Sequence, residues 1–290
     1  MYDLNLKEEL ALILLNATDI CKSYTVNPLL SNLSYAINES DKIGLIGVNG
    51  TGKSTLLYLM SGLLRPQEGQ VLYKGTEVVK RYPETLQDMF LVPEEVVLPN
   101  VKLKHYVKLN APFYPKFSGE VLKACLSDFG MTEDLELGAL SMGQKKKVFI
   151  SFAIATNTTL LLMDEPTNGL DIPSKSQFRK IIATNMSDDK AVIISTHQVR
   201  DIDSLLEHVL IIDEKKLLLN ESVTNICDKI YFAEQGANEP TDEALYVQPS
   251  VLGNHVLLPN TYHEDSNLNL EVLFNAMLAE REKMQQMFNR

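Results

Sequence analysis

Residues 47–55 read GVNGTGKST, and four of them fall at the spacing of a loop that wraps around phosphates: Gly47, Gly52, Lys53 and Ser54. Glycines let the backbone adopt positive φ and approach a ligand, so that successive N–H groups point inward and bind an anion. The lysine brings a positive charge to the outer phosphates, and the serine offers a hydroxyl to Mg²⁺. The spacing therefore indicates a site for ATP or GTP. The loop residues expected at the nucleotide are Gly47, Val48, Asn49, Gly50, Thr51, Gly52, Lys53, Ser54 and Thr55.

The elements on either side of this loop have the order that such a site requires. Residues 43–46 form an apolar, strand-like run, and Leu56, Leu57, Leu59 and Met60 follow the loop at helical spacing. The helix would add its positive N-terminal end to the phosphate site. The alternative, a glycine-rich turn with an incidental lysine, does not require a strand before it and a helix after it.

A second motif, LLLMDE at residues 160–165, supplies carboxylates at the end of another apolar run. A carboxylate at the end of a buried strand is rigid and shielded from water, which suits a ligand of nucleotide-bound Mg²⁺. We expect Asp164 to reach the metal and Glu165, one residue further on, to polarise the attacking water. The alternative is an ordinary solvated strand end.

The composition excludes several classes of protein. The formal net charge of −11 disfavours nucleic-acid binding, and we interpret the three adjacent lysines at 145–147 as a solvated helix face. No apolar run approaches the roughly 20 residues that cross a bilayer, and we find no signal peptide. Three widely spaced cysteines without a metal-ligand pattern fit a reducing cytosol: Cys21, Cys125 and Cys227.

Strand-like and helical segments alternate along most of the chain. Two or three short strands precede the glycine loop, residues 101–155 have helical spacing, and continuous apolar runs recur at 159–163, 191–195 and 209–212. Such runs are typical of parallel strands buried on both faces, and parallel strands need crossover connections. The pattern predicts an α/β fold with a mostly parallel sheet.

The last seventy residues differ from the rest and predict a small α+β appendage at 221–290, after an ATPase domain at 1–220. Residues 246–247 and 256–258 suggest a hairpin. A final helix is expected at about 268–288, capped by Asp265 or Ser266.

A family resemblance rests on Leu140, Ser141, Met142, Gly143 and Gln144. This LSMGQ segment resembles the LSGGQ signature of the ATP-binding subunits of ABC transporters, with Met142 in place of a glycine. The resemblance covers about residues 12–220 and implies a P-loop NTPase fold with an antiparallel β subdomain and a helical insert at about 100–155. A serine hydroxyl and glycine amides at a helix start can form a second anion site, although a plain helix cap is the alternative.

The same resemblance suggests roles for residues elsewhere. It implies that residues 168–171, including Asp171, cross a dimer interface, that His197 contacts the γ-phosphate, and that Tyr24 stacks on adenine, unless this tyrosine is a core residue. Glu94 stands where most of the family has a glutamine that contacts metal and water, and its neighbour Glu95 leaves this assignment open. Glutamate here resembles the exporter branch, as does the LE-x-x-F pattern of Leu270, Glu271, Val272, Leu273 and Phe274.

The function that the resemblance implies is ATP hydrolysis coupled to export. Two copies, or one copy and a homologous subunit, would close around two ATP molecules, with Ser54, Asp164 and Glu94 serving Mg²⁺. A separate transmembrane permease would dock near residues 94–117. There Tyr106, Phe113 and Tyr114 are either contact residues or core residues. The subunit would then be cytoplasmic and peripheral on the inner face of the cell membrane.

Two other functions keep the nucleotide motifs. The wording IGLIGVNGTGKST at residues 43–55 also resembles the ABC-type ATPases that act on ribosomes or nucleic acid, although the chain has one cassette and the wrong charge. A regulatory module that binds nucleotide with little hydrolysis is the third possibility, and the presence of Glu165 and His197 disfavours it.

Overall fold

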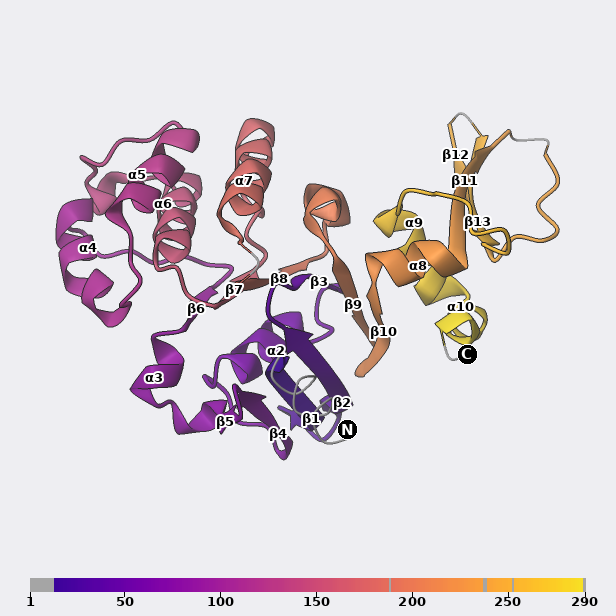
Figure 1. The fold of residues 1–290 in the computed structure, drawn as a ribbon, viewed down its shortest axis with the longest axis horizontal. Helices are drawn as coiled ribbons and strands as arrows, with labels where there is room; N and C mark the ends of the chain where they lie inside the picture. Colours follow the sequence, from indigo (N-terminus) through magenta and orange to yellow (C-terminus); the bar gives the residue numbers. More distant parts are fainter. Residues whose placement is uncertain (1–12, 188, 237–238, 252, 289–290) are drawn as a thin grey trace, which may run out of the picture.

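The computed structural model describes residues 13–187, 189–236, 239–251 and 253–288, so the first twelve residues of the expected ATPase domain lie outside the described part. Its centre is a six-stranded sheet in the order β10-β9-β3-β8-β7-β6 (Figure 1). Five strands are parallel and β10 is antiparallel to β9, which confirms the mostly parallel α/β fold. The strands are β3 Lys42–Ile46, β6 Met89–Val92, β7 Leu160–Asp164, β8 Ala191–Thr196, β9 His208–Asp213 and β10 Lys216–Ser222.

Both faces of this sheet are buried, which explains the continuous apolar runs. Successive residues of a strand point to opposite faces. Leu45 and Leu162 therefore pack into one core cluster, whereas their neighbours Ile46 and Met163 pack into the other. Every residue of β7 and β8 is buried. The strand ends are thus held rigidly from two sides.

Helix α2 (Lys53–Met60) and a four-stranded antiparallel sheet cover one face. This sheet has the order β2-β1-β4-β5, with β1 Ile13–Ser23, β2 Pro28–Asn38, β4 Glu68–Tyr73 and β5 Thr76–Glu77. The first two strands have eleven residues each, longer than the short strands that we expected. Shifts of register along their pairing let such long strands bend and remain in one hairpin.

Helices between β6 and β7 pack against the other face and extend beyond it (Figure 1). The long helices of this half are α4 Leu103–Asn110, α5 Gly119–Asp128, α6 Met142–Ala155 and, after β7, α7 Ile172–Asn185; α3 spans Pro83–Leu86. Short 3₁₀ helices occur at Val78–Lys80, Ala111–Phe113, Leu137–Ala139, Val199–Asp201 and Asp203–Leu205. Because β6 and β7 are neighbours, the helical segment lies within a single crossover.

The C-terminal part forms a separate sheet in the order β11-β13-β12 beside three helices, at the end of the molecule opposite α4 and α5 (Figure 1). Its elements are α8 Val223–Lys229, β11 Ile230–Gln235, β12 Tyr246–Ser250, β13 Gly253–Pro259, α9 Leu270–Ala279 and α10 Arg281–Phe288. The expected hairpin is confirmed, because Tyr246 pairs with Leu257 and Val247 with Val256.

The prediction of one final helix at 268–288 was wrong. Asn269 caps α9 by accepting a hydrogen bond from the Val272 amide at 3.2 Å, so neither Asp265 nor Ser266 starts the helix. Glu280 leaves the helical conformation and separates α9 from α10. Among the described residues, no helix is long and apolar enough to cross a membrane.

Candidate functional site

The glycine loop closes around its own lysine. Gly52, with φ of 99°, adopts the left-handed conformation immediately before α2, where a Cβ atom would also lie 2.8 Å from the Leu30 side chain. Lys53 is buried, and its Nζ donates hydrogen bonds to the carbonyl oxygens of Gly47 at 2.8 Å and Val48 at 3.2 Å. The ammonium therefore lies inside the loop, where it can exchange these carbonyls for phosphate oxygens.

A pocket of about 430 Å³ lies over this loop. Residues from distant parts of the chain meet here because β3, β7 and β8 are parallel neighbours whose carboxyl ends share one edge of the sheet. The pocket is lined by Leu29, Asn49, Gly50, Gly52, Lys53, Ser54, Thr55, Glu94, Glu165, Asn168 and His197. Most of the residues expected on the phosphate side are thus brought together.

Glu165 lies between two basic side chains. Its carboxylate is 3.7 Å from Lys53 Nζ and 2.8 Å from His197 Nδ1. Its backbone has φ of 44°, an uncommon conformation for a residue with a side chain, directly after the last residue of β7. Burial lowers the pKa of Lys53, and the negative charges of Glu165 and Asp164 oppose this effect.

Ser195 connects the two carboxylates and was not singled out from the sequence. Its hydroxyl donates to Asp164 Oδ1 at 2.5 Å and accepts from the Glu165 amide at 3.2 Å, while its own carbonyl accepts from the same amide at 3.1 Å. The signal was a buried serine directly after the apolar residues of a strand, two residues before His197. Ser195 fixes Asp164 and Glu165 relative to each other.

The structure separates Glu94 from its neighbour. Glu94 lines the pocket above the loop and accepts a hydrogen bond from Asn168 Nδ2 at 2.9 Å. Glu95 does not line that pocket, and it lines a smaller adjacent pocket together with Glu94. The geometry therefore favours Glu94 over Glu95 as the carboxylate that faces a nucleotide.

The signature segment lies outside this pocket. Ser141 caps α6, because its hydroxyl accepts from the Gln144 amide at 3.3 Å and the Gln144 side chain accepts from the Ser141 amide at 3.0 Å. A Cβ atom at Gly143 would lie 3.3 Å from the Gly169 carbonyl oxygen. None of Ser141, Gly143 and Gln144 lines the pocket over the glycine loop.

Comparison with known proteins identifies the family. The family model described as "ABC transporter" matches residues 30–168. The cytochrome c biogenesis ATP-binding export protein CcmA of Brucella abortus is 34% identical over 184 residues, which cover 61% of this chain and 82% of that protein. The chain belongs to the ABC transporter ATP-binding proteins. ATP binding and ATPase activity follow from this membership.

Further relatives agree with the assignment to this family. The linearmycin resistance ATP-binding protein LnrL of Bacillus subtilis is 26% identical over 223 residues, which cover 75% of this chain and 72% of that protein. A solved structure of an ATP-binding subunit of an ABC transporter matches with a TM-score of 0.67 at 23% identity, covering 73% of this chain and 91% of that chain. The latter supports the fold. The ribosomal alternative receives no support from these relatives.

One interpretation of the signature helix was wrong in this ABC ATP-binding subunit. The lysines at 145–147 do not form a uniformly solvated face, because Lys146 is only 5% exposed. Its Nζ donates to the carbonyl oxygens of Glu165 at 2.8 Å and Asn168 at 2.9 Å. Burial lowers the pKa of Lys146, while Glu94, Glu165 and Asp164 oppose the shift.

The remaining predicted residues of the ABC subunit lie at its surface. Tyr24 is exposed, with Lys22 Nζ 5.5 Å from its ring centroid, so the alternative of a core tyrosine was wrong. Asp171 caps α7 by accepting from the Ser174 amide at 2.9 Å, and hydrogen bonds from Ser174 lower the pKa of Asp171. Neither side chain lines the pocket over the glycine loop.

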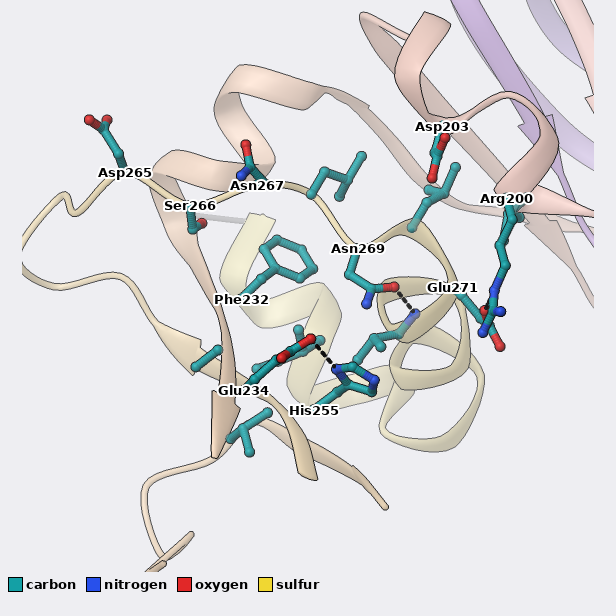
Figure 2. Close-up of a pocket in the computed structure, with 17 residues that line it drawn as sticks. Arg200, Asp203, Phe232, Glu234, His255, Asp265, Ser266, Asn267, Asn269 and Glu271 are labelled. Carbon is teal, nitrogen blue, oxygen red and sulfur yellow. Dashed lines mark hydrogen bonds and ion pairs between the residues drawn. The ribbon is translucent and has the colours of Figure 1, made fainter. Parts of the chain in front are cut away.

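A second pocket, of about 640 Å³, lies between the C-terminal part and the segment that follows His197 (Figure 2). Figure 2 shows Arg200 paired with Glu271 at the start of α9, and His255 beside Glu234, 3.6 Å apart. This pocket shares no lining residue with the one over the glycine loop. It marks where the C-terminal part meets the core of the subunit.

Proposed function

We propose that this subunit binds Mg·ATP, closes in a head-to-tail pair with a second copy or a homologous subunit, and hydrolyses ATP to drive export through a separate membrane protein. The proposal rests on one observation: the nucleotide motifs of this chain do not all line the same pocket. Glu165 and His197 lie with Lys53 at the loop pocket, whereas Ser141 and Gly143 lie outside it. One copy would then supply complementary halves of two sites, as a symmetric pair requires.

The oxygen donors near the loop fit Mg²⁺. Ser54 and Glu94 line the pocket, and Asp164 is buried with its carboxylate oriented by Ser195. The described residues contain no cluster of three or more His, Cys, Asp or Glu side chains that could hold a metal alone. Mg²⁺ usually coordinates one or two protein oxygens together with substrate phosphates and water, so it does not need such a cluster. The ion would neutralise charge on the phosphates.

Hydrolysis would use the groups around Glu165. Its carboxylate can accept a proton from, and thereby polarise, a water aimed at the γ-phosphate. His197 contacts the same carboxylate and is placed to bond the γ-phosphate when ATP enters. Lys53 would leave the carbonyls of Gly47 and Val48 and stabilise the charge that develops on the phosphates.

Closure would bury surface that one copy leaves exposed. Met142 and Ile172, at the first positions of α6 and α7, are 81% and 84% exposed. Each follows a helix cap that the resemblance assigns to the interface, Ser141 and Asp171. ATP would favour the closed pair because only there do its phosphates contact both subunits, and this difference in affinity drives the change in shape.

The substitution Glu165→Gln tests the hydrolytic assignment. It should leave ATP binding intact and lower turnover by on the order of 100-fold or more, because the amide cannot accept the proton. ATP binding and phosphate release are measured on the purified subunit and on the assembled transporter. Glu95→Gln serves as the matched control, since Glu95 does not line the loop pocket. Wild-type turnover by the Glu165 variant in the assembled transporter would contradict the assignment.

Export is supported by the names of relatives and by Glu94. Besides the linearmycin resistance and cytochrome c biogenesis proteins, the bacitracin transport ATP-binding protein BcrA of Bacillus licheniformis is 29% identical over 209 residues. A membrane partner would hold the subunit at the cytoplasmic face of the membrane and would select the cargo.

The partner's docking site is proposed at a groove of about 620 Å³ beside the helical segment, lined in part by Leu63, Leu86, Phe90 and Phe113. Phe113 is 69% exposed, so its ring is available to a partner. Tyr106 and Tyr114 are partly buried and pack on Phe152, with ring centroids 5.2 and 6.3 Å from that of Phe152. Tyr114 also lines this groove, whereas Tyr106 is not among its lining residues.

Phe113→Asp should reduce co-purification with the membrane partner and leave the subunit's own ATP binding unchanged. Tyr262→Asp is the matched control, because Tyr262 is an exposed aromatic in the C-terminal part. Equal co-purification of the two variants would place docking elsewhere.

A further inference from the structure

Lys146 occupies an unusual place for a charged side chain on a helix. It is buried, and its ammonium donates hydrogen bonds to two backbone carbonyls of one short segment, at Glu165 and Asn168. The side chains of those two residues line the pocket over the glycine loop. Lys146 therefore bonds to the backbone of the segment whose side chain is the proposed hydrolytic carboxylate.

The same helix contacts this segment at a second point. Gly143, one turn before Lys146, is close enough to Gly169 that an added Cβ would lie 3.3 Å from its carbonyl oxygen. The start of α6 and the segment 165–169 are thus in tight contact through backbone on one side and through the lysine on the other. A displacement of the helix start would displace this segment.

The need to offset nearby negative charge does not by itself explain the position of the Lys146 ammonium. Asp164, Glu165 and Glu94 carry negative charge near Lys146, and a nearby ammonium would offset it from many positions. Two directed bonds at 2.8 and 2.9 Å to carbonyls three residues apart specify a backbone conformation instead. That conformation includes the left-handed φ of 44° at Glu165. Fixed donors are what such an uncommon conformation requires to persist.

We propose that Lys146 is a positioning residue that transmits the position of the signature helix to Glu165 and Asn168. The proposal rests on the proposed function. In the head-to-tail pair, the start of α6 faces the ATP held by the partner, whereas Glu165 acts on the ATP held by its own glycine loop. Lys146 then joins the element that senses one nucleotide to the residue that hydrolyses the other.

Steady-state ATP hydrolysis by Lys146→Met tests the proposal. Methionine has a similar length and removes the donors, so kcat should fall by roughly 10- to 100-fold while the KM for ATP stays within about threefold. Lys146→Arg, which keeps a charged donor, should recover part of kcat. Lys145→Met is the matched control on the same helix, because Lys145 makes neither of the two bonds among the described residues, and it should hydrolyse ATP at the wild-type rate.

Hydrogen exchange of the nucleotide-free subunit gives a second measurement that needs no partner. The amides of Asn168 and Leu170 donate to the carbonyls of Glu165 and Thr167, both at 3.1 Å. In Lys146→Met these amides should exchange faster than in wild type, while the amides in the second half of α6 keep their protection. Loss of protection throughout α6 would mean that Lys146 only stabilises the helix, and would overturn the proposal.

Other outcomes are equally decisive. A wild-type kcat in Lys146→Met, an equal loss in Lys145→Met, or a raised KM at unchanged kcat would each overturn the positioning role. If the assembled transporter with the unsubstituted subunit did not hydrolyse ATP at all, the proposed function would fail instead, and the exchange of the Asn168 and Leu170 amides would still test the position of the segment.

Discussion

Two buried lysines contact different parts of Glu165. Lys53 faces the side chain, with its Nζ 3.7 Å from the carboxylate, and Lys146 faces the backbone, with its Nζ 2.8 Å from the carbonyl oxygen. Both ammonium groups otherwise bond to carbonyls, Lys53 within its own loop and Lys146 across to another element.

The difference teaches what each charge is for. Carbonyls of the glycine loop lie where phosphates would bind, so the bonds of Lys53 are exchangeable and its charge is available to a substrate. The carbonyls held by Lys146 belong to a segment packed against α6, and exchanging them would release that segment. We therefore propose that Lys53 binds the ligand and that Lys146 maintains the shape of the site.

The largest expected effect separates these roles. Lys53→Met should weaken ATP binding and also lower turnover, by on the order of 1,000-fold in kcat/KM, because the charge that contacts the phosphates is lost. Binding of a fluorescent ATP analogue and phosphate release measure the two parts. Lys146→Met provides the comparison, since it should change turnover alone. Equal binding defects in the two variants would break the distinction between a ligand lysine and a positioning lysine.

A smaller effect is expected from Ser195, which contacts both the Asp164 carboxylate and the Glu165 amide. Ser195→Ala removes the donor to Asp164 and the hydroxyl that accepts from the Glu165 amide, so kcat should fall by about 10-fold and the Mg²⁺ requirement should rise. Titration of ATPase activity with Mg²⁺ measures both changes. Ser151→Ala is the control, because this buried serine bonds only to the Lys147 carbonyl of its own helix in the described structure. An unchanged Mg²⁺ titration would mean that Ser195 does not orient Asp164.

The smallest expected effect on turnover concerns a lysine and carboxylate outside the site. Burial raises the pKa of Asp88, but hydrogen bonds from Lys74, Thr159 and Tyr73 outweigh it and bring the pKa to about 2. Because the folded pKa lies below the ordinary value of 3.8, this stabilisation is complete above about pH 4 and is lost as the pH falls towards 2.

Asp88→Asn should therefore lower the free energy of unfolding at pH 7 by about 2 kcal/mol and leave KM and kcat unchanged. Urea unfolding at pH 7 and pH 3 measures the loss, which should be smaller at the lower pH. If turnover changed while the stability stayed the same, Asp88 would belong to the site, which would contradict our assignment.

Local motifs made half of the site predictable. The phosphate loop is nine consecutive residues, and Asp164 and Glu165 directly end an apolar strand, so their chemistry could be inferred from neighbours in the chain. The parallel strands were also predictable, because burial on two faces leaves continuous apolar runs. The break between α9 and α10 was not, since Glu280 is an ordinary helix former and only the local backbone shows where the helix ends.

The three adjacent lysines show the limit most clearly. Successive helical residues point about 100° apart, so no more than one of the three lysines can face a given neighbouring segment. The sequence does not show which segment packs against the helix. The contact of α6 with residues 165–169 depends on packing between segments about twenty residues apart, and that packing selects Lys146.

The sequence by itself determined a loop that binds ATP or GTP, the strands that carry the loop and the acidic pair, and the family to which the signature belongs, because each depends on residues close together in the chain. Only the tertiary structure decided that two lysines contact Glu165, that Ser195 orients the carboxylates, and that the signature lies outside the pocket. These depend on which distant segments the two cores bring into contact, and such contacts leave no spacing that can be read along the chain.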